Sequence, residues 1–289
     1  MRFTPATFTF FLFLIIGGHV LLPVLVAASI ISRDVHRNPI LISWIFAWMV
    51  YSVSMCLLLY SGENLLYSQP PRTLCLAQAA VNYSSVVLCT FGALMFVVNL
   101  WLSIRSIALE KAPCYANNRI WRCFAIIFPC AIFLIVLLLV LLVGSAHPTE
   151  VFREYASFFC SVDLPIIRGV QGFAAMALFA MLVFEVWIAV LLGQMHKRKV
   201  YLRKSGGPAS YHLCIRVAFF TVYILLAIAA TVCIWTRPTR GPFESFTDII
   251  LSTVPLAVFL CFGTQRDLVR AYVCGILWVW KRIFNRKRY

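Results

Sequence analysis

The chain has 289 residues, of which 62% are hydrophobic and only 12% are charged, and its formal net charge is +15. A soluble domain of average composition carries roughly 25% charged residues. A chain this apolar would expose large apolar surfaces in water, so its solvent must be lipid, which excludes an ordinary soluble protein. Because the basic residues fall in short segments beside apolar ones, the positive charge indicates orientation in a membrane and not a nucleic-acid partner.

Seven apolar stretches predict an all-α membrane protein built as a seven-transmembrane-helix bundle. A helix needs about 20 residues to cross about 30 Å of hydrocarbon. The last stretch is the shortest, and the polar run from Gln265 to Asp267 ends it. The expected spans, within a single domain of residues 1–289, are 7–31, 40–61, 76–104, 121–144, 165–193, 213–235 and 246–263.

The first stretch has two features of a cleaved signal peptide, a charged residue at Arg2 and small residues at 27–28. The apolar core of a signal peptide is only about 7–15 residues long, and this run is longer. We therefore expect it to be a helix of the bundle, with its removal as the alternative.

Lys and Arg are distributed unevenly between the two sides of these spans. With the N-terminus outside, nineteen of the 25 Lys and Arg residues fall in the inner segments. An excess of basic residues on the cytosolic side is the signal that orients membrane helices. We therefore expect the N-terminus outside and the C-terminus in the cytosol, with the bilayer of the plasma membrane as the surroundings of the chain.

After Asp267 the chain stays apolar and rich in Trp up to a basic end at 281–288. This run is too short to cross a bilayer, and its pattern is typical of a short amphipathic helix in the membrane interface, here over about 267–282. Cys274 within it is a candidate for palmitoylation. The weaker alternative is a re-entrant segment or an eighth span.

Two cysteines lie in the outer loop regions. Cys75 opens the third span, and Cys160 lies in the loop between spans four and five. The outer side is oxidising, so a disulfide between them is permitted and would fasten the long loop across the mouth of the bundle. The alternative is two free thiols that pack as small apolar groups.

Polar side chains in the outer halves of the spans are costly in hydrocarbon and usually face the bundle interior or a water-filled cavity. They are therefore candidates for a site that binds an extracellular ligand. The alternative is that they only join helices, at about 0.6 kcal/mol each. The ligand-binding candidates are Gln78, Asn82, Arg168, Gln171, Trp235, Asp248 and Ser252.

Three features mark the inner half of the predicted bundle. Glu185 is the only acidic residue deep within a span, which makes it a candidate switch or proton site, with structural hydrogen bonding as an equal alternative. The loop after span five carries Lys197, Arg198 and Lys199, which can meet anionic lipid or dock a cytosolic partner. Tryptophans near the inner helix ends are interpreted as interfacial anchors, namely Trp44, Trp48, Trp101, Trp121, Trp278 and Trp280.

The residue patterns of several chemistries are missing from the sequence. Span seven has no Lys for a Schiff base, and no Cys-x-x-Cys or His/Cys cluster has the spacing of a zinc site. No Ser/His/Asp or Cys/His set can be placed at one depth of the bundle. We therefore expect no cofactor, no metal and no enzymatic activity.

Two parts of the chain resemble a known family. The first comprises RDVHRNP (33–39), Trp44, YSVSMCLLLYSG (51–62) and CLAQAA (75–80), and the second comprises Pro255 and FGTQRD (262–267). These segments are similar to those of seven-helix, G protein-coupled receptor-like proteins of mushroom-forming fungi. The resemblance implies a receptor for an unknown extracellular ligand that signals to a cytosolic heterotrimeric G protein.

Comparison with the rhodopsin-like receptor pattern gives the expected positions of a conformational switch. Span three ends in NLWLSIR (99–105) without an Asp/Glu-Arg-Tyr triplet, and Arg105 stands in for the arginine of that triplet. Span seven contains Pro255 but no Asn-Pro-x-x-Tyr motif. Asn99, Arg105 and Pro255, together with Glu185, are the expected switch residues. The alternatives to a receptor are a small-solute transporter or channel, and a structural membrane protein without a signalling role.

Overall fold

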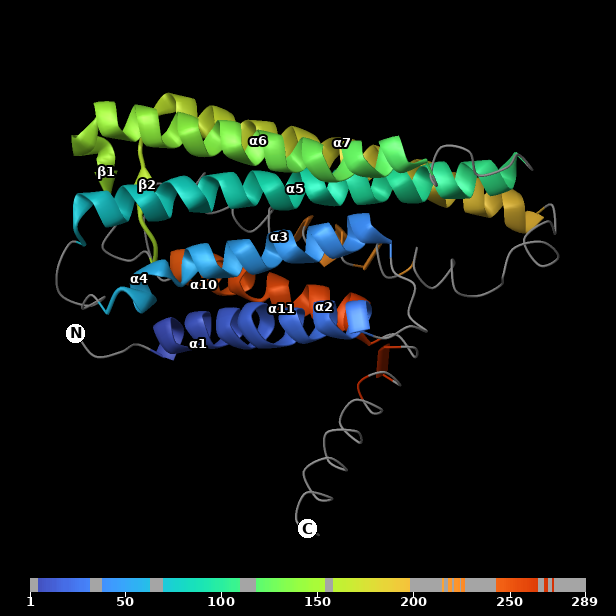
Figure 1. The fold of residues 1–289 in the computed structure, drawn as a ribbon, viewed down its shortest axis with the longest axis horizontal. Helices are drawn as coiled ribbons and strands as arrows, with labels where there is room; N and C mark the ends of the chain where they lie inside the picture. The colour runs from blue at the N-terminus through green and yellow to red at the C-terminus, as the bar shows by residue number, and fades with distance from the viewer. Residues whose placement is uncertain are drawn as a thin grey trace, which may run out of the picture.

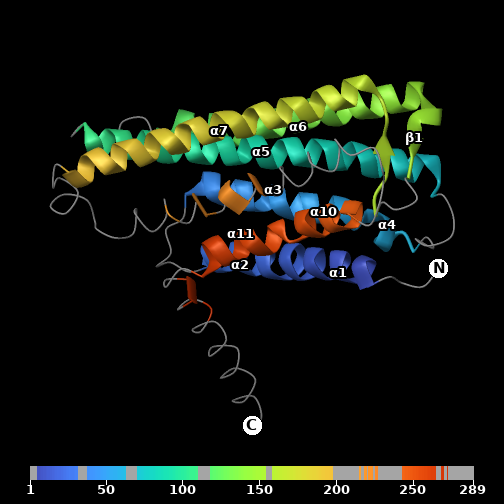
Figure 2. The same ribbon diagram turned by 180° about the vertical axis from the view of Figure 1, so that it is seen from behind.

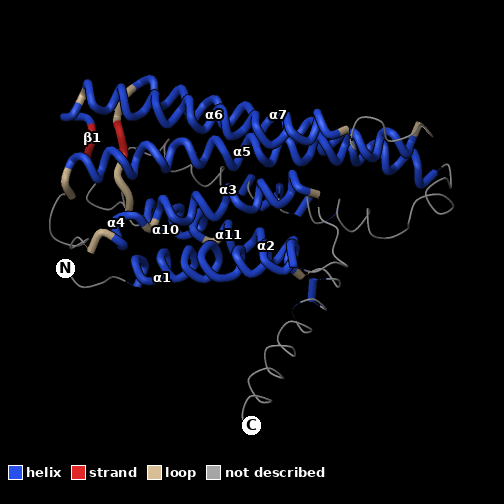
Figure 3. Tube along the Cα trace, in the orientation of Figure 1, coloured by secondary structure: helices blue, strands red, loops and turns tan. Residues whose placement is uncertain are grey.

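The computed structural model describes residues 5–31, 38–62, 70–109, 118–153, 158–197 and 243–264, together with 215, 218–219, 221–223, 225–226, 268–269 and 272. At 107, 196–197 and 243–247 only the backbone is described. The described part is almost wholly helical, as Figure 3 shows, and its helices lie side by side with roughly parallel axes (Figure 1).

Among the described residues, four helices are long and apolar enough to cross a membrane. The first runs from Pro5 to Ile31 and consists of α1 (Pro5–Leu14), the π-helix η1 (Ile15–Leu21) and α2 (Leu22–Ile31). The other three are α5 (Arg72–Ala108), α6 (Arg119–Ala146) and α7 (Pro165–Lys197). Their length and composition are those of an integral membrane protein with α-helical spans.

Two further apolar helices are each divided by a break. α3 (Pro39–Met55) is followed after Cys56 by α4 (Leu57–Tyr60), and α10 (Phe243–Ser252) is followed after Thr253 by α11 (Val254–Gly263). Pro255 accounts for the second break, because proline lacks an N–H and its ring clashes with the carbonyl four residues earlier. Near the first break, the Ser52 and Ser54 hydroxyls donate to main-chain carbonyls of α3, an interaction that bends helices.

Asparagine caps begin two of the helices. The side chain of Asn38 accepts a hydrogen bond from the N–H of Ile40 at 3.0 Å, and that of Asn118 accepts one from Ile120 at 3.0 Å. Each cap satisfies a main-chain donor that has no partner within the helix. Pro39 occupies the first turn of α3, where its missing N–H costs nothing.

α5 is the most buried of the long helices. Of its most apolar stretch 61% is buried, against 17% in both α6 and α7. α6 and α7 pack against one side of α5, and α3 packs against the other (Figures 1 and 2). The outward faces of α6 and α7 carry large exposed apolar side chains, including Ile127, Leu134, Leu138, Leu142, Phe179, Val183 and Val186. Such a surface is stable against lipid and not against water.

Contacts between helices give their relative directions. α3 and α5 are antiparallel, because Ser54 contacts Ser85 whereas Trp44 contacts Phe96. α6 is also antiparallel to α5, and α7 is parallel to it. α10 and α11 run parallel to the first helix, since α1 packs on α10 and η1 on α11. The bundle thus has two ends: the disulfide end, where α5, α7 and α10 begin, and the far end, where α5, α7 and α11 finish (Figure 1).

Two glycines in η1 bring the first helix very close to two neighbours. A Cβ on Gly17 would lie 2.7 Å from the backbone nitrogen of Leu256 in α11, and one on Gly18 would overlap the side chain of Ser52 in α3. Close approach of this kind is how helices associate in lipid, where packing replaces the hydrophobic effect. η1 therefore joins the first helix to both α3 and α11.

We expect Gly17→Ala to lower the free energy of unfolding by about 1–3 kcal/mol, because the added methyl group meets main-chain atoms that cannot rotate away. Thermal unfolding of the purified protein in detergent measures the change. Gly172→Ala in α7 is the matched control, since nothing lies within 4 Å of a Cβ at that position. Equal melting temperatures for the two variants would contradict the close contact.

The segment between α6 and α7 forms a short hairpin at the disulfide end. It contains the 3-10 helix η2 (Pro148–Glu150) and the strands β1 (Val151–Phe152) and β2 (Ser161–Val162). The strands are antiparallel, with Val151 opposite Val162. Figures 1 and 2 show β2 running from the α6–α7 side past α5 toward α4 and α10. The hairpin therefore crosses one end of the bundle.

In the part of the chain that the structure describes, helices with described bounds occupy six of the seven stretches in which spans are expected. Each begins or ends within a few residues of the expected bounds, and the π-helix and the two breaks are additions that the sequence analysis does not predict. Most of the expected span 213–235 lies outside the described residues, as do most of the expected interfacial helix at 267–282 and Cys274 within it.

Candidate functional site

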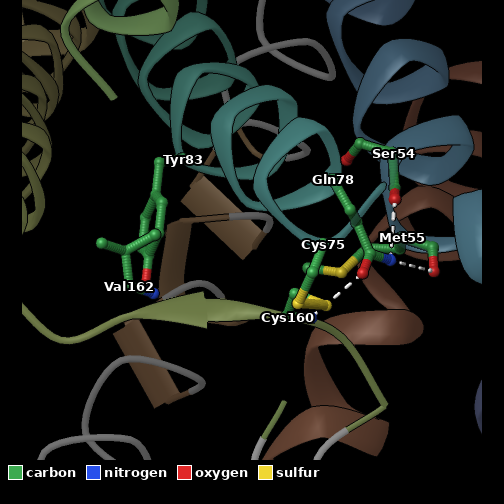
Figure 4. The surroundings of a disulfide bond; sticks show 7 residues. All are labelled: Ser54, Met55, Cys75, Gln78, Tyr83, Cys160 and Val162. Atoms are coloured by element: carbon green, nitrogen blue, oxygen red, sulfur yellow. Dashed lines mark hydrogen bonds between the residues drawn. A yellow bond between two sulfur atoms is a disulfide. The ribbon is translucent and has the colours of Figure 1, made fainter. Parts of the chain in front are cut away.

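The predicted disulfide between Cys75 and Cys160 is confirmed. It joins the first turn of α5 to the residue that precedes β2, and both cysteines are buried. Figure 4 shows the bond lying beside the end of α3. The most buried of the four long described helices and the loop across the disulfide end are thus covalently connected.

Gln78 lies one turn along α5 from the disulfide and is fully buried. Its Nε2 donates to the carbonyl oxygens of Ser54 at 3.3 Å and Met55 at 3.4 Å, and its Oε1 accepts from the N–H of Cys160 at 3.0 Å (Figure 4). The two carbonyls belong to the last turn of α3, where the usual helical donors are missing. In hydrocarbon no water is present to replace them, so Gln78 joins α3, α5 and the loop.

Two further contacts hold the loop in place. The Tyr83 hydroxyl accepts a hydrogen bond from the N–H of Val162 at 3.4 Å. On the other side of the bundle, Phe158 stacks on Phe10 of α1 with ring centroids 4.6 Å apart, and it meets Phe11 edge-on at 6.5 Å. Phe158 is not among the residues predicted from the sequence, although an aromatic residue two positions from a disulfide cysteine in a mostly polar loop is a usable signal.

Of the predicted ligand-binding residues, four lie in the interior of the bundle. Gln78 has the contacts described above, Ser252 is fully buried and donates to the Ile249 carbonyl at 2.7 Å, and Asp248 is half-buried on α10. Asn82 is 4% exposed, and its Oδ1 has no hydrogen-bond partner among the described residues. Their role in ligand binding stays a prediction.

Two other predicted ligand-binding residues lie elsewhere. Arg168 and Gln171 are exposed on α7, and Arg168 forms an ion pair with Asp163 at 3.0 Å. The expectation that they face the interior is wrong, because the buried face of α7 here is formed by Ile167, Val170 and Ala174. Trp235 lies outside the described residues.

Glu185 lies in the half of α7 nearer the far end and accepts a hydrogen bond from Thr221. Both residues border a small cavity of about 10 Å³. That volume is roughly what one water requires. The cavity is otherwise lined by apolar and aromatic side chains from α3, α5, α7 and α11, among them Trp44, Phe96, Met181 and Phe262.

An aromatic cluster forms one wall of this cavity. Trp44 stacks on Phe96 with ring centroids 5.7 Å apart and meets Phe262 edge-on at 5.4 Å. Its Nε1 donates to the carbonyl oxygen of Cys89 at 3.1 Å. The prediction that Trp44, Trp48 and Trp101 are interfacial anchors is therefore wrong, because all three are at least nine-tenths buried among the helices.

Tyr223 reaches the break in the last helix. Its hydroxyl donates to the carbonyl oxygen of Ile250 at 3.0 Å and also contacts the hydroxyl of Thr253. These groups lie just ahead of Pro255, where the helical ladder is interrupted. Thr221 and Tyr223 are two residues apart, so one short segment is bound to α7 on one side and to the α10–α11 break on the other.

The other predicted switch residues have local partners. Asn99 is buried and its Oδ1 accepts from the Nε1 of Trp121 at 3.1 Å, so it joins α5 to α6. Arg105 is exposed, and its guanidinium carbon lies 5.1 Å from the ring centroid of Trp101. Pro255 is buried at the start of α11, next to Gly17.

The predicted partner-binding residues fall at the edge of the described chain. Lys197 is the last residue of α7, and only its backbone is described. Arg198 and Lys199 lie outside the described residues. The position of Lys197 places the start of this basic segment at the far end of the bundle.

No protein-family model matches the chain, and no curated protein matches it. Within the part of the chain that the structure describes, no three His, Cys, Asp or Glu side chains form a group that could hold a metal ion.

Proposed function

We propose that the chain is a seven-helix receptor of the plasma membrane that senses an extracellular ligand and signals to a cytosolic heterotrimeric G protein. The observation that carries the proposal is the arrangement around α5. Helices of alternating direction surround this buried helix, and a disulfide-bonded loop is fastened across one end of it. A bundle of this form can bind a ligand at one membrane face and respond at the other.

Three observations support seven spans and the proposed orientation. α7 ends at the far end and α10 begins at the disulfide end, and the predicted span 213–235 would join these two ends by one further crossing. Disulfides form in oxidising compartments, which supports an extracellular position for the disulfide end. Basic residues mark cytosolic segments, and Arg105, Arg119 and Lys197 all lie at the far end. The two signals agree.

The ligand site of this proposal lies beneath the loop at the disulfide end. Asn82 supplies a carbonyl oxygen without a described partner, which is costly in a buried position and available to a donor group on a ligand. Asp248 and Ser252 lie on α10, which packs on α1. A ligand that arrives from outside has to pass the loop held by Cys160 and Phe158.

The response at the far end would pass through the segment at Thr221 and Tyr223. It is bound to Glu185 of α7 and to the break before Pro255, and both contacts are made by single hydroxyl groups. Ligand binding can shift a bundle between two states only through contacts that differ between them. The two states would differ in this way if the Thr221 and Tyr223 hydroxyl contacts were made in one state and broken in the other. The proposal keeps the interfacial helix at 267–282 and its palmitoylated Cys274 as cytosolic elements.

Recovery of Gα subunits with the purified protein tests the coupling. We expect wild type to retain Gα, and replacement of Lys197, Arg198 and Lys199 by Gln to reduce the retained amount severalfold, because the basic segment would form the docking surface. Arg72→Gln with Arg168→Gln is the matched control at the disulfide end. Wild type that retains no Gα from a representative panel would overturn the G protein assignment.

One observation favours a second candidate, a transporter or channel for a small solute. Glu185 places a carboxyl group among apolar side chains next to a cavity, which is a common feature of ion and proton pathways. Solute flux in liposomes that contain the protein, abolished by Glu185→Gln, would favour this candidate over the receptor.

A further inference from the structure

A group of aromatic side chains at the far end of α5 and α7 has no part in the proposed switch. The ring centroid of Trp101 lies 5.0 Å from that of Trp187 and 5.4 Å from that of Phe184. Trp101 is nine-tenths buried, whereas Trp187 is 49% exposed. We call Trp101, Phe184 and Trp187 the aromatic shelf. It extends from the interior of the bundle to the surface that faces lipid.

Arg105 is placed over this shelf. Its guanidinium carbon lies 5.1 Å from the ring centroid of Trp101, within the range of a cation–π contact. No Asp or Glu among the described residues forms an ion pair with it. In addition, the Nε1 of Trp101 is a buried donor without an acceptor in the described part of the chain. A positive charge without a described acidic partner therefore lies over the ring of Trp101, and a guanidinium group suits an oxyanion.

An apolar stripe on α7 leads to the same place. Phe179, Val183, Trp187 and Val190 follow one another at spacings of three or four residues, so they share one face of the helix. All four are exposed, by 70%, 50%, 49% and 51%. The stripe runs along the direction of an acyl chain in a bilayer, and it meets the Arg105 end at Trp187.

We propose that Arg105 and the aromatic shelf bind the phosphate of an acidic phospholipid of the cytosolic leaflet, with an acyl chain along the stripe on α7. The planar guanidinium group suits phosphate oxygens, and stacking on Trp101 holds it in one orientation. The assignment to the cytosolic leaflet is the only part of this proposal that rests on the orientation given under the proposed function.

Lipid retention tests the site. The protein is placed in nanodiscs of equal parts phosphatidylserine and phosphatidylcholine, then released and weighed by native mass spectrometry. We expect wild type to retain phosphatidylserine preferentially. Arg105→Gln should weaken that retention about fivefold, the effect of one basic residue at an anionic surface. Trp187→Leu should weaken it as well, because the shelf loses its exposed edge.

Arg72→Gln is the matched control, since Arg72 is an exposed arginine on the same helix at the opposite end. Equal retention by wild type and Arg105→Gln would overturn the site, and so would equal losses in Arg105→Gln and Arg72→Gln. Displacement of the lipid by millimolar inorganic phosphate would assign the site to a free anion and overturn the lipid proposal. Because both leaflets of the nanodisc contain the acidic lipid and no Gα is present, the result is independent of orientation and coupling.

Discussion

Replacing Cys75 and Cys160 together by serine is expected to lower the free energy of unfolding by about 2–4 kcal/mol. The bond closes a loop over a sequence separation of 85 residues, and the unfolded chain gains freedom when it is removed. The loop would also lose its anchor beside Gln78, whose Oε1 accepts from the N–H of Cys160. With the loop released, Gln78 would keep only its bonds to the Ser54 and Met55 carbonyls at the end of α3.

Thermal unfolding in detergent, with and without reductant, measures this effect. Reductant should lower the melting temperature of wild type and leave the double variant unchanged. Cys130→Ser is the control, because Cys130 is a free and exposed cysteine whose loss should change the stability by no more than about 0.5 kcal/mol. A double variant as stable as wild type would mean that the side-chain contacts of the loop suffice without the covalent bond.

Removing the hydroxyl groups of Thr221 and Tyr223 is expected to change the balance between the two states of the bundle. Each hydroxyl joins its segment to another helix, Thr221 to Glu185 and Tyr223 to the Ile250 carbonyl. Hydrogen bonds between membrane helices contribute about 0.6 kcal/mol on average and up to about 1.7. Thr221→Val or Tyr223→Phe should therefore shift the ratio of states roughly threefold to twentyfold, and the double variant more.

Two measurements separate this effect from the coupling itself. Nucleotide exchange on Gα without ligand should rise in the variants, and hydrogen–deuterium exchange of α11 should rise even where no Gα is present. Tyr60→Phe is the control, since Tyr60 is exposed at the other end of the bundle and bonds to His19. Unchanged amide exchange in the double variant would exclude the segment as a link between α7 and the break at Thr253.

Glu185→Gln separates a proton switch from a structural hydrogen bond. The amide oxygen of glutamine still accepts from Thr221, so the contact survives while the ionisable group is lost. Altered signalling in this variant, at equal surface expression, is the result expected of a switch. Unchanged signalling would leave Glu185 as a hydrogen-bond acceptor only.

The spans of the first, third, fourth and fifth helices were predictable because the bilayer requires a long, continuous apolar run, and such a run is visible in any sequence. The Cys75–Cys160 disulfide was predictable for a related reason, since the topology left only two cysteines in the outer loop regions. Burial within the bundle was not predictable in the same way. Almost every side chain is apolar, so the sequence carries little contrast between faces that meet lipid and faces that meet other helices.

The tryptophans illustrate this limit. Trp44 and Trp101 occur near helix ends, where tryptophan usually meets the membrane interface, yet both are buried against neighbouring helices. Arg168 and Gln171 were expected to face the interior, yet both are exposed on α7. A shift of one or two positions along a helix decides whether a polar residue faces inward. The π-helix at η1 depends on the fit of Gly17 and Gly18 against two other helices, and no local pattern encodes that fit.

Sequence alone determined that this protein lies in lipid, the approximate helix bounds and the expected orientation. The reason is that apolar length, charge bias and cysteine position are properties of single segments. Only the tertiary structure decided which polar groups meet. Gln78 finds the open carbonyls of α3, Thr221 finds Glu185 and Tyr223 finds the break before Pro255, since each pair comes from different helices. In hydrocarbon these groups have no water to bind, so the packing of the helices alone decides their partners.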